Sequence, residues 1–185
     1  MPNQAKIMKG GIVLSTALVA LLFRSSPVMA DEYFQIMAMH SQKCAQVDGA
    51  SQDDNASISQ WDCVNQPNVY WRRQALYAGF FLLIAQHSGK CMVQNNQWNN
   101  QNVPTPEDNG LGISQYPCNQ NDDFWLWKQQ PAGAGSYYIV NKRTNKCIQV
   151  DGASQDNGAS ISQWDCVNQP NVKWILPAQA APSNL

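Results

Sequence analysis

Short runs of hydrophobic residues alternate with clusters of polar, turn-forming residues along most of the chain. Runs at 33–39, 80–86 and 137–141 combine aromatic and aliphatic residues that favour strands, and each is followed by Ser, Thr, Gly or Asn. No segment after residue 30 keeps a 3.6-residue apolar period, so few helices are expected. The pattern predicts an all-β fold of short strands.

Part of this pattern occurs twice almost without change. Residues 46–69 and 149–172 are identical at 22 of 24 positions, and differ only at Asp54/Asn157 and Asn55/Gly158. The offset is 103 residues throughout. Such self-similarity predicts an architecture of repeated structural units.

A more divergent third copy lies between these two. Every copy has a polar turn ending in Lys-Cys, then Ile-Ser-Gln, an aromatic residue, one further residue and a second cysteine, and finally a tryptophan. The units span about 33–78, 79–132 and 133–177. The closing tryptophans are Trp71, Trp127 (or Trp125) and Trp174.

Each unit is expected to contribute four strands. In the first unit they are the hydrophobic run, 44–47, 57–61 and a strand around Trp71. Twelve short strands in three copies predict a closed barrel with pseudo-threefold symmetry, a β-trefoil, rather than a three-bladed or sandwich arrangement. The shared core is expected to contain Ile58, Ile113, Ile161 and the closing tryptophans.

Six cysteines in an exported chain indicate three disulfides. Two cysteines hold equivalent positions in every unit, and equivalent positions should form equivalent bonds. The predicted pairs are Cys44–Cys63, Cys91–Cys118 and Cys147–Cys166.

The N-terminus has the features of an export signal. Lys6 and Lys9 precede an apolar run at 10–23, and small residues at 25–30 give a cleavage site after about Ala30. The apolar run is shorter than the ~20 residues that a spanning helix needs, which disfavours a membrane anchor. We therefore predict a signal peptide at 1–30, one domain at 31–177, a disordered tail at 178–185, and a secreted or periplasmic mature protein.

The net charge of the predicted mature chain disfavours some classes of binding partner. Cleavage removes three basic residues, which leaves 9 against 13 acidic residues and a net charge of about −4. Without a basic cluster, nucleic acid and anionic membranes are poor partners. Abundant amides and aromatic residues suit a neutral, hydroxyl-rich ligand.

The repeated motifs resemble those of the ricin B-type (R-type) lectin family over about residues 33–176. The resemblance rests on Lys-Cys before the second strand, Val-Asp-Gly after it, aromatic-x-Cys after the third strand and the closing tryptophan. It implies a β-trefoil that binds galactose-type or other sugars, often to target an enzyme or toxin to a glycan surface.

In that family a sugar pocket uses an acidic residue two after the first cysteine, an aromatic residue two before the second, and Asn and Gln shortly before the closing tryptophan. This chain keeps the aromatic residue and the Asn, but has Gln at the acidic position and Val in place of the Gln. Aspartates two residues after the substituted position could turn inward to compensate. A flat indole can cover the C–H face of a sugar while amides and carboxylates meet its hydroxyls. The predicted carbohydrate-binding residues are Gln46, Asp48, Trp61 and Asn68 in the first unit and Gln149, Asp151, Trp164 and Asn171 in the third.

The middle unit departs further from the pattern. It has Val93 at the acidic position, Tyr116 as the aromatic residue and an insertion at 95–112. Its pocket is expected to be absent or altered.

Catalysis, metals and cofactors are not expected. Glycoside hydrolysis needs two positioned carboxylates. The only glutamates of the mature chain are Glu32, close to the signal, and Glu107, in the insertion, while Asp62 and Asp165 lie in turns beside cysteines. Paired cysteines leave no zinc ligand or thiol nucleophile.

Three functions remain open from the sequence. The first is a free-standing lectin that binds a carbohydrate or glycoconjugate. The second is the glycan-binding subunit of a secreted toxin or enzyme complex. The third is a trefoil that has lost sugar binding and contacts protein, since a fold does not fix function.

Overall fold

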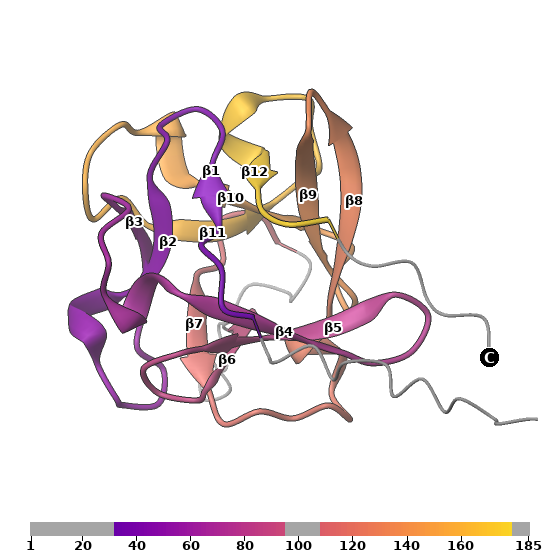
Figure 1. Cartoon of the computed structure of the whole chain (residues 1–185). Helices are drawn as coiled ribbons and strands as arrows, with labels where there is room; N and C mark the ends of the chain where they lie inside the picture. The colour runs from indigo at the N-terminus through magenta and orange to yellow at the C-terminus, as the bar shows by residue number, and fades with distance from the viewer. Residues whose placement is uncertain (1–31, 95–107, 179–185) are drawn as a thin grey trace, which may run out of the picture.

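The computed structural model describes residues 32–94 and 108–178 (Figure 1). Within them lie twelve strands and no α-helix, and five short 3₁₀ turns (η1 to η5) connect some of the strands. The strands are β1 (Met37–Ala38), β2 (Cys44–Val47), β3 (Ile58–Trp61), β4 (Trp71–Ala75), β5 (Phe80–Ala85), β6 (Cys91–Gln94), β7 (Ile113–Tyr116), β8 (Trp127–Gly133), β9 (Ser136–Asn141), β10 (Cys147–Val150), β11 (Ile161–Trp164) and β12 (Trp174–Ile175).

Six strands form a closed antiparallel ring. β1 pairs with β12, β12 with β9, β9 with β8, β8 with β5 and β5 with β4. Backbone hydrogen bonds between Phe34 and Trp71, both 2.8 Å, join β4 to the segment before β1 and complete the ring. Closure leaves no free sheet edge in the ring.

The other six strands form three hairpins attached to this ring. β2–β3 extends from β1, β6–β7 from β5 and β10–β11 from β9. Single bridges join the third strands of neighbouring units, or the residues directly before them, and so connect the three hairpins. A six-stranded ring capped by three hairpins is the β-trefoil that the repeats predicted.

The core confirms the predicted shared interior. Ile58, Ile113 and Ile161 are buried in one cluster with Trp71, Trp127 and Trp174. The indole N–H of each of these tryptophans donates to a carbonyl of its unit's second strand, at 2.9–3.0 Å. Trp127, and not Trp125, is therefore the closing tryptophan of the middle unit.

The first strand is shorter than predicted. The run at 33–39 was expected to be one strand, but only Met37–Ala38 is extended with partners on both sides. In the other units the equivalent strand belongs to a continuous hairpin, β4–β5 or β8–β9, whereas β1 pairs with the two-residue β12 from the far end of the chain. The short partner limits the length of β1.

All three predicted disulfides are confirmed. Cys44 is bonded to Cys63, Cys91 to Cys118 and Cys147 to Cys166, with Cα–Cα distances of 4.9–5.1 Å. Each bridge joins the first residue of one hairpin strand to a residue just beyond the other strand, and the second cysteine of each pair is exposed.

Some predicted segments lie outside the described residues. These are the signal peptide at 1–30, the insertion from 95 to 107 and all but the first residue of the tail at 178–185. In the described part of the chain, no helix is long and apolar enough to cross a membrane.

Candidate functional site

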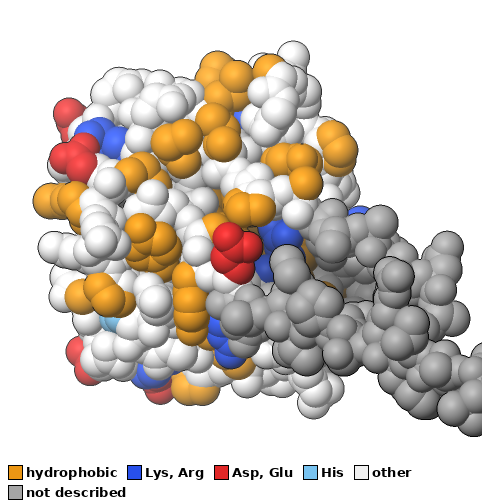
Figure 2. All heavy atoms as spheres, viewed as in Figure 1, with side chains coloured by type: hydrophobic (Ala, Val, Ile, Leu, Met, Phe, Trp, Pro, Cys, Tyr) orange, Lys and Arg blue, Asp and Glu red, His pale blue; other side chains and the backbone are white. Residues whose placement is uncertain are grey.

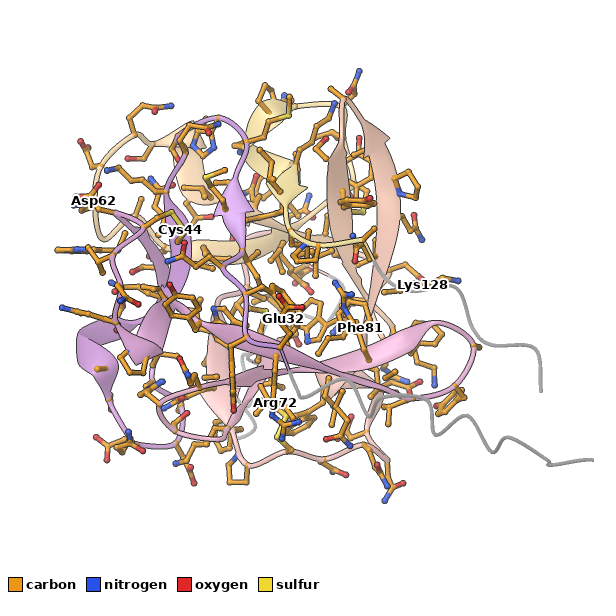
Figure 3. All side chains as sticks on the ribbon, in the orientation of Figure 1. Glu32, Cys44, Asp62, Arg72, Phe81 and Lys128 are labelled. Carbon is orange, nitrogen blue, oxygen red and sulfur yellow. A yellow bond between two sulfur atoms is a disulfide. The ribbon has the colours of Figure 1, made fainter. Side chains whose placement is uncertain are left out.

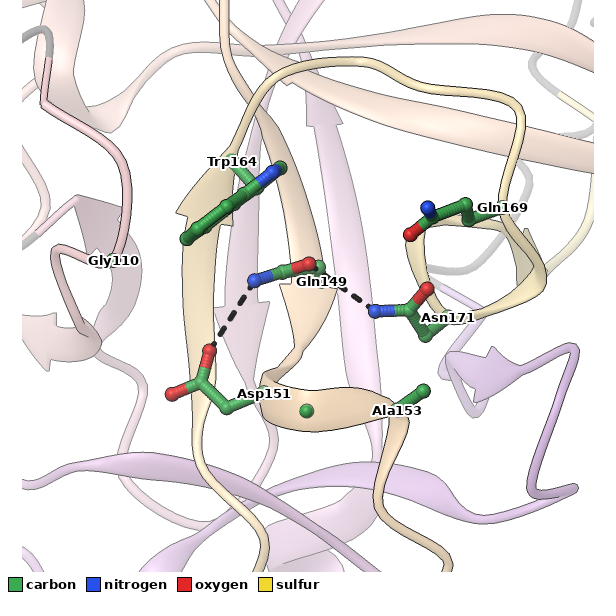
Figure 4. Close-up of a pocket in the computed structure, with 8 residues that line it drawn as sticks. Gly110, Gln149, Asp151, Ala153, Trp164, Gln169 and Asn171 are labelled. Carbon is green, nitrogen blue, oxygen red and sulfur yellow. Dashed lines mark hydrogen bonds between the residues drawn. The ribbon is translucent and has the colours of Figure 1, made fainter.

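A hollow of about 660 Å³ opens on the surface of the third unit (Figure 4). It brings together all four predicted site residues of that unit, which lie on β10, η4 (Asp151–Ala153), β11 and η5 (Pro170–Val172). Its lining residues are Gly110, Gln149, Asp151, Gly152, Ala153, Trp164, Gln169 and Asn171.

Trp164 and Trp61 are the open tryptophans of the described structure. Their side chains are 39% and 40% exposed, whereas the three closing tryptophans are fully buried. Each open tryptophan is the last residue of its unit's third strand, opposite the first cysteine across the hairpin. The disulfide fixes this strand end, so the indole is held at the surface by a rigid support. The closing tryptophans thus lie in the core as predicted, and the two tryptophans predicted to bind carbohydrate are exposed.

The amide side chains of the predicted site are buried more deeply than residues at the rim of a pocket would be. Gln149 and Asn171 are nearly buried, and Asn171 Nδ2 donates to Gln149 Oε1 at 3.1 Å and to the Val150 carbonyl at 3.0 Å (Figure 4). In the first unit Asn68 Nδ2 makes the same bonds to Gln46 Oε1 and the Val47 carbonyl, at 3.1 and 3.0 Å. The Asn and Gln side chains therefore fix one another as the base of the pocket.

Each site aspartate reaches the pocket by a tight turn directly after the second strand. Gly152 follows Asp151 with a φ of +60°, and Gly49 follows Asp48 with a φ of +59°; this left-handed conformation favours glycine. Asp151 Oδ1 accepts a hydrogen bond from the Ser162 hydroxyl and one from Gln149 Nε2 at 3.4 Å. The pocket thus contains a carboxylate two residues after the position where the family pattern has one.

Contacts between units, which the sequence reasoning did not find, place a loop of one unit beside the third strand of the next. Gln60 of the Ile-Ser-Gln motif is fully buried, and its Nε2 donates to the carbonyls of Ser154 and Asp156 at 2.8 and 2.9 Å. Gln115 makes the equivalent bonds to Ser51 and Asp53, at 2.8 and 2.9 Å. Each unit therefore holds a loop of another unit beside its own third strand. The signal was present in the sequence, since a polar Gln recurs inside a buried strand in all three copies.

An ion pair reinforces this contact beside each open tryptophan. Asp62 accepts from Lys43 Nζ at 2.5 Å and from Asn157 Nδ2 of the third unit at 2.9 Å. It lies at the periphery of the molecule, beyond Cys44 (Figure 3). Asp165 pairs in the same way with Lys146 and with Asn109 of the middle unit, the latter at 3.0 Å. Hydrogen bonds first from the lysine and then from the asparagine lower the pKa of both carboxyls below their ordinary 3.8.

These lowered pKa values predict an acid-sensitive contribution to stability. A carboxyl whose pKa is lower in the folded than in the unfolded state stabilises the fold above the unfolded pKa, and this contribution is lost as pH falls through the folded pKa. Urea unfolding of the wild type and of the Asp62→Asn/Asp165→Asn variant should therefore differ by the same amount from pH 7 to pH 5, and the difference should shrink below about pH 4. A difference that stays constant down to pH 3 would contradict this assignment.

Three comparisons place the chain among known proteins. The family model described as "Ricin-type beta-trefoil lectin domain-like" matches residues 22–106, 78–164 and 121–183. The chain belongs to the ricin-type β-trefoil lectin family. No curated protein matches it in sequence.

Solved structures with the same fold include lectins, toxins and enzymes. The designed threefold-symmetric protein ThreeFoil is 28% identical with a TM-score of 0.72, over 80% of this chain and 99% of ThreeFoil. The C-half of an earthworm R-type lectin in complex with GalNAc is 18% identical with a TM-score of 0.57, over 78% of this chain and 96% of that one. An exo-β-1,3-galactanase from Clostridium thermocellum is 22% identical with a TM-score of 0.70, over 80% of this chain but 30% of the enzyme. The family supports carbohydrate binding in general, and the neighbours show that the same fold also occurs as one part of larger enzymes.

The middle unit of this ricin-type trefoil has lost the polar base of the pocket. Val93 and Phe124 hold the places of the Gln and Asn, and both are buried in an apolar cluster against which Tyr116 packs. Trp125 donates its indole N–H to the Pro117 carbonyl at 3.0 Å. The altered middle pocket that the sequence predicted is consistent with this packing.

No group of three or more metal-binding side chains occurs among the residues that the structure describes. His40 and His87 lie in the polar turns before the first cysteine of their units and contact the carbonyls of Ser154 and Ser51 in other units, both at 2.9 Å. On the face drawn in Figure 2, charged side chains are few and scattered among neutral polar and hydrophobic ones, which agrees with a neutral ligand.

Proposed function

We propose that this protein is a secreted or periplasmic lectin with two carbohydrate pockets, one over Trp61 and one over Trp164. The observation that carries the proposal is an open indole beside a carboxylate and two fixed amides in one hollow. The apolar face of a pyranose ring would stack on the indole. Its hydroxyls would bond to Asp151 and to the lone pairs and N–H groups of Gln149 and Asn171 that remain free.

The chemistry of the pocket favours binding over cleavage. Among the described residues that line the hollow, Asp151 is the one carboxylate, while glycoside hydrolysis needs two across the scissile bond. The carboxylate can instead accept charge-assisted hydrogen bonds from sugar hydroxyls, which are about twice as strong as neutral ones. Ligands are expected to be neutral glycans, and galactose or N-acetylgalactosamine termini are the first to test, given the GalNAc complex of the earthworm lectin and the galactanase.

A second function deserves a specific test, since the fold also occurs in toxins. A mosquitocidal holotoxin and the cytolethal distending toxin of Actinobacillus actinomycetemcomitans contain it, with TM-scores of 0.65 and 0.63. The same pockets would then direct a toxin or enzyme subunit to a glycan surface. Co-purification of a partner from the native culture supernatant or periplasm would favour the subunit over the free lectin. The three disulfides and the lectin family indicate an extracytoplasmic location in either case.

Replacing both open indoles should abolish glycan binding without unfolding the protein. The Trp61→Ala/Trp164→Ala variant loses the floor of each pocket. For every glycan that the wild type binds on the array, we expect the affinity of this variant to fall at least tenfold. The measurement is a glycan array with neutral termini (galactose, N-acetylgalactosamine, glucose and N-acetylglucosamine), followed by titration of the best ligand. Each single variant should keep one site and lose the avidity of two.

Two outcomes would count against the lectin proposal. One is a folded wild type that binds no glycan on the array, which would favour a trefoil that contacts protein. The other is a double variant that binds as well as the wild type, which would place the sugar elsewhere. Circular dichroism and the melting temperature of the variant show that the fold is retained.

A further inference from the structure

Three loops, which we call the bridging loops, connect the units in a cycle. They precede the third strand of each unit and comprise residues 53–55, 108–110 and 156–158. The loop of the first unit contacts the middle unit, since Asn55 N donates to the Gln115 carbonyl at 2.8 Å. The loop of the middle unit contacts the third, and that of the third contacts the first, through Gly110 N to Gln163 and Gly158 N to Gln60, both 2.8 Å.

The two differences between the duplicated segments both fall in a bridging loop. Asp54 and Asn55 of the first unit correspond to Asn157 and Gly158 of the third, and all the other 22 positions are identical. The middle unit, although strongly diverged elsewhere, has Asn109 and Gly110 at these two places. The Asn-Gly pair therefore occurs in the two loops that face an open tryptophan, and Asp-Asn occurs in the loop that faces Tyr116.

The residue at the first of the two positions (54, 109 or 157) is complementary to the charged side chain that it faces in the neighbouring unit. Asn157 donates to Asp62, and Asn109 donates to Asp165. In the middle unit Pro117 stands where the others have that aspartate, and there Asp54 takes its place as the partner of Lys90. Whether this position holds Asn or Asp therefore follows from the unit that the loop contacts, and not from the unit to which the loop belongs.

The second position lies beside the open indole of the neighbouring unit. A Cβ added to Gly158 would lie 4.0 Å from Cζ3 of Trp61, so a longer side chain there would extend along the ring. Gly110 lines the hollow of Trp164 on the opposite side from Asn171 (Figure 4), and a Cβ added to it would meet nothing within 4 Å, so that a side chain there would enter open space. Both glycines have a positive φ, +83° and +86°, and Asn55 has +66°, so the loop can accept asparagine in the same backbone conformation.

We propose that each sugar site is built by two units, and that Gly158 and Gly110 are the specificity-determining residues which keep the indole faces open to a glycan. The inference rests on the proposed lectin function and adds to it. The site over Trp61 depends on the bridging loop of the third unit, and the site over Trp164 depends on that of the middle unit. The middle unit is then required for binding although its own pocket is apolar.

The test isolates the Trp61 site in a Trp164→Ala background. Gly158→Asn copies the residue found at the equivalent place in the first unit, and we expect it to weaken binding at least tenfold on the array of neutral glycans described above. The matched control, Asn55→Gly, makes the reciprocal exchange in the loop that faces Tyr116, and should leave the affinity within twofold. Gly158→Ala, whose Cβ would lie at ordinary contact distance from the indole, should weaken binding less than Gly158→Asn, and its positive φ should lower the melting temperature by a few degrees.

The outcomes separate this inference from the lectin proposal. If Gly158→Asn binds as tightly as its parent while Trp61→Ala/Trp164→Ala does not bind, the shared site is wrong and the lectin proposal stands. If the wild type binds none of the glycans, both are wrong. Should Gly158→Asn lower the melting temperature by more than about 5 °C, the mirror variant decides: Gly110→Asn in a Trp61→Ala background must weaken binding tenfold for the inference to hold.

Discussion

Reduction of the three disulfides is expected to lower the free energy of unfolding by about 10 kcal/mol, close to the whole stability of a domain of this size. The bridges close loops of 19, 27 and 19 residues, and the loop-entropy relation gives about 3 kcal/mol for each. Because one cysteine of each pair is exposed, a reductant can reach the bridges in the folded protein. The measurement is guanidinium unfolding with and without a phosphine reductant, followed by tryptophan fluorescence.

A variant lacking one bridge provides the control for this experiment. Cys147→Ser/Cys166→Ser should lose about a third of the full effect and should remain folded in dilute buffer. A fully reduced chain whose unfolding midpoint lies within a few tenths molar of the oxidised one would show that the ring and core suffice without the bridges. The disulfides would then not be needed for stability, and they would no longer be a physical reason to place the protein in an oxidising, extracytoplasmic compartment.

The fold could be predicted from the sequence because its signals repeat. Three copies of the cysteine pair and the closing tryptophan defined unit length, strand number and disulfide pairing, and only the trefoil satisfied them together. The ambiguity between Trp125 and Trp127 remained, because the two tryptophans lie two residues apart and the repeat can be aligned on either. Only the bond from the Trp127 indole to the Met92 carbonyl resolves it.

The sequence predicted which residues of a unit form its site. It did not predict how deeply those side chains are buried, nor which residues of other units line the pocket. The family pattern located Gln149 and Asn171, yet their mutual hydrogen bond, which makes them the pocket base, depends on η5 turning back towards β10. Residues such as Gly110 come from another unit, and no local spacing reveals which loop will lie beside which tryptophan. That information lies in the cyclic order of the units, which the sequence specifies only through the packing of the whole ring.

Trp71→Ala and Trp61→Ala, ten positions apart, are expected to have opposite effects. Trp71 is fully buried, and its loss creates a large cavity and leaves the Ala45 carbonyl without its 2.9 Å indole donor. We expect a loss of about 3–5 kcal/mol in unfolding free energy, with glycan binding retained in the fraction that stays folded. Trp61, 40% exposed, should cost about 1 kcal/mol or less while its pocket no longer binds. We would measure denaturant unfolding and glycan titration for both variants, in a Trp164→Ala background that isolates the Trp61 site.

If Trp61→Ala instead destabilised the protein as much as Trp71→Ala, the exposed indole would have a structural role. The loss of glycan binding in Trp61→Ala could then no longer be attributed to the missing pocket floor.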